Sequence, residues 1–211
     1  MANIFISHSK RDEATVAAFC NVFARTQHGA FLAEFEAYAV PPWTQIKNWV
    51  QQSSALFVLL SPHLQTTPYT QNWVSYEVGL ACALNKPVWV YEHWNNPVAF
   101  PIPYLTDYVM YNPASQEDLN AIRQLVEVYD QGPTLVLAGL GALLGAALSG
   151  GLGAGVGAVV GGAIGQRRPP GTPVRCPQVH CGITFRIYNR LQGLYCPACR
   201  GVMYVRWPDA T

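Results

Sequence analysis

Residues 55–60 read Ala-Leu-Phe-Val-Leu-Leu, six apolar residues in a row. A run this short and this uniformly apolar predicts a central strand buried on both faces, as the strands of parallel sheets are. A sheet buried on both faces needs helices on both sides, so the flanking sequence should alternate strands with amphipathic helices. The stretch therefore predicts an α/β fold arranged around one central strand.

The sequence on either side of that stretch follows the expected alternation. Further strands are predicted at 3–7, 30–32, 87–91 and 107–111, and helices at 43–53 and 70–85. Apolar residues spaced three and four apart predict two more helices, with the stripes Val16, Phe19, Cys20, Phe23 and Leu119, Ile122, Val126, Tyr129. Together they predict a flavodoxin-like sheet of five parallel strands, whose ligands bind beyond the carboxyl ends of the strands.

Charge divides the 211 residues into three segments. Residues 1–130 hold six Lys/Arg against eleven Asp/Glu, residues 131–166 hold no charge, and residues 167–211 hold seven Arg against one Asp. Only 12% of the chain is charged, which argues against a wholly solvated surface. The N-terminal sequence has no basic or apolar leader pattern, so we expect the first segment in the cytoplasm.

Three short motifs in residues 3–130 resemble the boxes of a Toll/interleukin-1 receptor (TIR) domain. Residues 5–12 read Phe-Ile-Ser-His-Ser-Lys-Arg-Asp, residues 59–62 read Leu-Leu-Ser-Pro, and residues 73–78 read Trp-Val-Ser-Tyr-Glu-Val. The last is similar to the Trp-x-x-x-Glu pattern of TIR domains that cleave NAD. Their order and spacing along the chain make the resemblance specific.

The resemblance implies cleavage of NAD⁺ at the nicotinamide ribose, with ADP-ribose or a cyclic isomer as the other product. Glu77 is the implied catalytic residue, because a carboxylate can stabilise the positive ribosyl centre that develops as nicotinamide leaves. The implied NAD⁺ cleft consists of Ser7, His8, Lys10, Glu34, Glu36, Trp43 and Trp73, with either Glu34 or Glu36 as the acidic residue that follows the second strand. The alternatives are ordinary structural roles: a solvated glutamate for Glu77, a core residue for Trp73 and a turn residue for Ser7.

Small residues recur at every fourth position of the uncharged segment, residues 131–166. They are Gly141, Gly145, Ser149, Gly153, Gly157, Gly161 and Gly165. Such a glycine zipper favours close helix contacts in lipid, so we expect a membrane segment that also drives self-association. A flexible linker is the alternative. Because Arg167 and Arg168 follow the segment, we expect a hairpin turning near residues 149–151, with both ends on the cytoplasmic face, rather than a single span.

Two cysteine pairs in the last segment predict a metal site. Cys176 and Cys181 precede a strand-like run, and Cys196 and Cys199 follow it. Four thiolates so arranged are similar to the ligands of a structural Zn²⁺ in a zinc ribbon, with His180 as an alternative to Cys181. We expect loss of a ligand to disorder this module without unfolding residues 1–130, and its arginines to face anionic lipid rather than nucleic acid.

These patterns lead to two hypotheses of different classes. The first is an NAD⁺-cleaving TIR enzyme that oligomerises at a membrane as a defence effector or signal producer, with an unknown upstream activator. The second is a non-catalytic TIR adaptor whose glycine zipper docks on or permeabilises a membrane. Release of nicotinamide from NAD⁺ discriminates between them.

Overall fold

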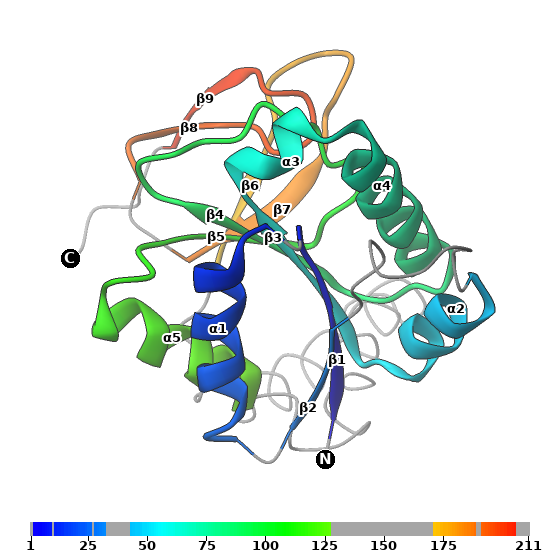
Figure 1. The fold of residues 1–211 in the computed structure, drawn as a ribbon. Coiled ribbons are helices and arrows are strands. Elements are labelled where there is room, and N and C mark those ends of the chain that lie inside the picture. The colour runs from blue at the N-terminus through cyan, green and yellow to red at the C-terminus, as the bar shows by residue number, and fades with distance from the viewer. Residues whose placement is uncertain are drawn as a thin grey trace, which may run out of the picture.

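The computed structural model describes residues 2–9, 11–26, 28–32, 43–127, 171–188 and 191–205 (Figure 1). The uncharged segment 131–166 and the predicted cleft residues Lys10, Glu34 and Glu36 lie outside these ranges. In the described part of the chain, no helix combines the length and the apolar character that a membrane crossing requires.

The predicted elements of the front half occur in the predicted order, and the short helix α3 is an addition to them. The strands of the front half are β1 (Asn3–Ser7), β2 (Gly29–Leu32), β3 (Ala55–Leu60), β4 (Val88–His93) and β5 (Asp107–Tyr111). The helices are α1 (Glu13–Phe23), α2 (Trp43–Gln52), α3 (Pro62–Thr66), α4 (Pro68–Ala83) and α5 (Gln116–Glu127). The C-terminal part adds β6 (Thr172–Arg175), β7 (Thr184–Ile187), β8 (Gly193–Tyr195) and β9 (Val202–Tyr204).

The sheet confirms the flavodoxin-like α/β prediction and extends it. Its strand order is β2-β1-β3-β4-β5-β7-β6, and the first five strands are parallel. The five predicted strands are all present, and the C-terminal segment adds two more, because β7 pairs with the edge of β5 in parallel and β6 pairs with β7 in antiparallel fashion. From β1 the chain adds β2 on one side and then β3 on the other, so the strand order reverses between β1 and β3. Folds of this kind bind ligands at that point.

Alternate residues of the central strand β3 pack into two separate hydrophobic cores, one on each face of the sheet. Leu56, Val58 and Leu60 of β3 face the core under α2 and α4, whereas Phe57 and Leu59 face the core under α1 and α5. Figure 1 shows α1 and α5 together on one side of the sheet and α2 and α4 on the other. The uniformly apolar run is therefore explained by burial on both faces, as predicted.

Two helices differ in detail from the prediction. The buried residues of α1 are Phe19, Val22 and Phe23, while Cys20 is only half-buried. Helix α4 begins earlier than the predicted residue 70, because Pro68 fits the first turn of a helix, where no backbone N–H is needed. The helix ends at Ala83. Asn85 then adopts a left-handed φ of 52°, a conformation that terminates helices.

The C-terminal module shares its core with the front half. The buried residues of the core under α2 and α4 include Cys176, Phe185, Ile187, Leu194, Cys196 and Met203. The aromatic rings of Phe185 and Tyr108 are 6.1 Å apart in an edge-on arrangement. The expectation that the module can disorder without unfolding residues 1–130 stays a prediction, but loss of the module would expose part of the core that both halves share.

Candidate functional site

Glu77 interrupts the apolar face that α4 turns toward the sheet. The buried residues of this helix are Thr70, Trp73, Val74, Glu77, Val78 and Ala81, spaced three and four apart as one helical face requires. Glu77 is only 1% exposed. The structure thus excludes the alternative of a solvated helix glutamate. A buried carboxyl group in an otherwise apolar stripe is a frequent sign of function.

The environment of Glu77 favours the protonated carboxyl group. Burial raises its pKa from the ordinary value of 4.5 to about 8, and the nearby Ser7 hydroxyl opposes this only in part. Ser7 Oγ and Glu77 Oε1 are both buried, and within the described part of the chain neither atom has a partner at hydrogen-bond distance and angle. The site therefore holds two buried polar atoms that a bound molecule could satisfy.

The structure brings the predicted cleft residues Trp43 and Trp73 together. Their ring centroids are 4.4 Å apart, although Trp43 begins α2 and Trp73 lies 30 positions later in α4. Tyr76 packs edge-on against both rings, and Tyr69 packs against Trp73. Trp73 is 5% exposed and belongs to the core, whereas Trp43 is 51% exposed. This aromatic cluster flanks Glu77, one helical turn from Trp73.

Ser7 and His8 lie at the carboxyl end of β1, but on opposite faces of the sheet. Successive strand residues alternate in direction, and Phe5 belongs to the core under α4 while Ile6 belongs to the core under α1. Ser7 accordingly approaches Glu77, and His8 approaches Asp12 at the start of α1. Only Ser7 shares the immediate surroundings of Glu77.

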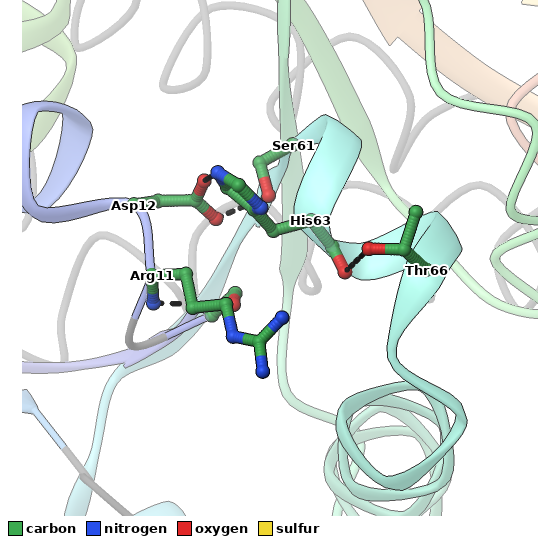
Figure 2. A network of polar contacts seen from close by, with 6 residues as sticks. Arg11, Asp12, Ser61, His63 and Thr66 are labelled. Carbon is green, nitrogen blue, oxygen red and sulfur yellow. Dashed lines mark hydrogen bonds and ion pairs between the residues drawn. The ribbon is translucent and has the colours of Figure 1, made fainter.

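A second polar cluster, which was not predicted from the sequence, lies at this edge of the sheet. Figure 2 shows the Asp12 carboxylate pointing toward Ser61, which follows β3, and His63 in α3. The Ser61 hydroxyl donates to Asp12 Oδ2, and His63 Nε2 lies 3.8 Å from Asp12 Oδ1. Burial raises the pKa of Asp12, and Ser61, His63 and His8 oppose that rise. The cluster links the segment after β1 to the segment after β3, next to the point between these strands where the strand order reverses.

A groove between α1 and α5 is separate from these residues. Small side chains line its α1 wall, and the lining includes Ala14, Ala17, Arg25, Gln116 and Arg123. Both helices cover the sheet face opposite α4. The groove therefore does not lead to Glu77.

The four predicted metal ligands converge on one point. The Sγ atoms of Cys176, Cys181, Cys196 and Cys199 all lie within 4.8 Å of one another. The Cys176–Cys199 and Cys181–Cys196 sulfur pairs are 3.6 Å and 3.9 Å apart. A tetrahedral Zn²⁺ site with bonds of about 2.3 Å places its sulfurs about 3.8 Å apart. The cluster can hold a metal ion, and the exposed His180 is not part of it.

Comparisons with known proteins give distant matches only. No protein-family model and no curated protein matches the sequence. Among solved structures, the chain is similar to the TIR domains in the structure of the activated Roq1 resistosome directly recognizing the pathogen effector XopQ. The identity is 11% and the TM-score 0.37, over 46% of this chain and 60% of that one.

Two further solved structures give similarly distant matches. The glutaminase domain of Trypanosoma brucei CTPS with bound acivicin shares 12% identity with a TM-score of 0.31, over 43% of this chain and 36% of that one. CapF with the inhibitor 3-isopropenyl-tropolone shares 7% identity with a TM-score of 0.30, over 52% and 30%. The chain thus spans less than two thirds of each matched structure, and likenesses this distant assign it neither a family nor an activity.

Proposed function

We propose that this protein is a TIR-type enzyme that cleaves the bond between nicotinamide and ribose in NAD⁺, with Glu77 as the catalytic carboxylate. The observation that carries the proposal is the burial of Glu77 in the apolar face of α4, beside the Ser7 hydroxyl and the aromatic cluster. The Trp-x-x-x-Glu spacing and the flavodoxin-like strand order support it. Ser7, Trp43 and Trp73 are proposed to contact the substrate.

Cleavage of the nicotinamide–ribose bond requires mainly one negative charge beside the ribose. The bond between the ribose C1′ and the pyridinium nitrogen breaks, and its electron pair neutralises the nitrogen, so nicotinamide leaves without taking up a proton. The positive ribosyl centre is then captured by water, which releases one proton and yields ADP-ribose, or by another atom of the same molecule, which yields a cyclic isomer. Ionised Glu77 stabilises the positive centre.

A neutral carboxyl group would not serve in this reaction. Nicotinamide needs no proton to leave, and a protonated Glu77 offers no charge to the ribosyl centre. The free enzyme, in which burial favours the neutral form, is therefore a resting state. Because Glu77 is 1% exposed, the side chains around it must move before substrate can reach it. We propose that the upstream activator accelerates this movement, and that the unactivated protein makes it often enough for nicotinamide release to be measured.

Trp43 offers a direct test of substrate binding, because it is exposed enough to be replaced without loss of the fold. Stacking of a base on an aromatic side chain contributes about 1–3 kcal/mol. We expect Trp43→Ala to raise KM for NAD⁺ about tenfold and Trp43→Phe to restore most of the affinity. Trp94→Ala is the matched control, since Trp94 is similarly exposed at 54% and directly follows β4. An unchanged KM in Trp43→Ala would remove Trp43 from the site.

The adaptor hypothesis is the second candidate, because Glu77, at 1% exposure, cannot contact a substrate unless the side chains around it move. A neutral, inaccessible glutamate is also compatible with a TIR surface that only recruits partners. Full-length protein incubated with NAD⁺ separates the two, because the enzyme releases nicotinamide and the adaptor does not. Self-association and attachment to the cytoplasmic face of a membrane through residues 131–166 are proposed for either case, on the sequence pattern alone.

A further inference from the structure

The connection between β4 and β5 leaves part of the sheet without a helix. Two parallel neighbours are normally joined by a crossover whose helix covers one face of the sheet. Here residues 94–106 form no helix, and the prolines at 97, 101 and 103 are incompatible with one. Yet the residues of that face, such as Val90 and Tyr108, are 0% and 2% exposed. The connection contributes Val98, Ile102 and Leu105 to this core, but it forms no helix, so a further segment has to complete the cover.

The C-terminal module supplies that cover. Phe185 and Ile187 of β7, Leu194 of β8 and Met203 of β9 belong to the same core as Val90 and Tyr108. β7 and β6 continue the sheet at the edge of β5, and Figure 1 shows β8 and β9 on the side away from α1 and α5. Two backbone hydrogen bonds join the module to the crossover, from Ile102 N to Pro197 O at 2.8 Å and from Arg186 N to Thr106 O at 3.0 Å.

A buried ion pair connects the cysteine turn to β4. Glu92 is 1% exposed, and its carboxylate accepts hydrogen bonds from Val98 N and Tyr108 Oη. Arg200 Nη2 lies 3.3 Å from Glu92 Oε1 and provides the positive charge in this cluster. A buried carboxylate left without its cationic partner is strongly unfavourable, so the position of Arg200 matters for this half of the sheet.

The geometry of the cysteine turn determines where Arg200 lies. Arg200 directly follows Cys199 and has a left-handed φ of 61°, a conformation that needs support from its surroundings. That support comes from hydrogen bonds of the same turn, from Arg200 N to Cys196 O and from Cys196 N to Gly201 O, both 2.8 Å long. A metal bound to Cys196 and Cys199 would hold this turn closed.

We propose that the four-cysteine module takes the place of the missing crossover helix, and that its bound Zn²⁺ controls the stability of β4 and β5 in the front sheet. The metal centre is then a conditional part of the flavodoxin-like fold rather than a feature of an independent ribbon. Removal of the metal by a chelator uncovers the face between β4 and β5 and releases Arg200 from Glu92. This inference does not depend on NAD⁺ cleavage.

Hydrogen–deuterium exchange of the full-length protein tests the proposal. Zn²⁺ content is first measured by elemental analysis, with one ion per chain expected, and exchange is then compared before and after chelation. We expect exchange at the β4 and β5 amides to accelerate at least tenfold on chelation and to recover when Zn²⁺ is restored. Faster exchange confined to residues 171–205, or a chain that takes up no Zn²⁺, would overturn the proposal.

A pair of arginine variants tests the ion pair itself. Arg200→Ala, with Zn²⁺ still bound, should accelerate exchange at β4 severalfold, because Glu92 loses its cationic partner. Arg186→Ala is the matched control, since the Arg186 side chain is exposed on β7 of the same module. An Arg200→Ala protein that retains its metal and exchanges at β4 like the wild type would contradict the role given to Arg200.

Discussion

Glu77→Gln is expected to reduce the rate of nicotinamide release by about a hundredfold to a thousandfold while the protein remains folded. Glutamine preserves the size of the side chain and its ability to accept a hydrogen bond, but it cannot ionise. The variant therefore lacks the negative charge that stabilises the ribosyl centre, and loss of one such electrostatic contact in an active site has effects of about this size. The decrease should appear in kcat, because the charge acts in the transition state.

The comparison needs a control for the removal of a negative charge as such. Glu117→Gln serves, because Glu117 is an exposed glutamate in the first turn of α5, on the opposite side of the sheet. We expect this variant to cleave NAD⁺ at the wild-type rate. Circular dichroism and Zn²⁺ content should be unchanged in both variants. Wild-type activity in Glu77→Gln would show that Glu77 is a structural residue.

The same substitution is expected to stabilise the protein at high pH. The folded protein holds the Glu77 proton up to a pKa of about 8, whereas the unfolded chain releases it near 4.5. The contribution of the neutral carboxyl group to stability is therefore complete below pH 4.5 and is lost as the pH rises through 8. Each pKa unit corresponds to about 1.4 kcal/mol, so the free energy of unfolding of Glu77→Gln should exceed that of the wild type by a few kcal/mol at pH 9.

Denaturant titrations at pH 5, 7 and 9 measure this difference. The advantage of Glu77→Gln over the wild type should be small at pH 5 and grow with pH, since only the wild type must ionise a buried group. Glu117→Gln again provides the control, with no such trend. A difference between Glu77→Gln and the wild type that does not change with pH would mean that Glu77 is not buried in solution as it is in the structure.

Local patterns were sufficient for every element of the front half except the five-residue helix α3. The run of residues 55–60 and the strands at 3–7 and 107–111 occur where the sequence predicts them, because a strand buried on both faces leaves a short apolar signature. The four-residue spacing of Trp73 and Glu77 predicted one shared helical face. These features depend on residues that are close in the sequence, and the spacing of apolar residues along the chain is enough to predict them.

The features that escaped prediction all depend on contacts between distant segments. Asp12 and Ser61 are 49 residues apart, and Arg200 and Glu92 are 108 residues apart. The pairing of β7 with β5 adds two strands to the sheet, and an edge strand does not record its partner in its own sequence. The prolines between β4 and β5 could have signalled the missing crossover helix, but not which segment replaces it.

The pH dependence of nicotinamide release by the full-length wild-type protein tests the central claim most directly. Because ionised Glu77 is the form that acts, kcat/KM for NAD⁺ should rise about tenfold per pH unit below 8 and level off above it, reporting the pKa of the free enzyme. Absence of nicotinamide release across pH 6 to 9, or a rate that does not change over that range, would contradict the account.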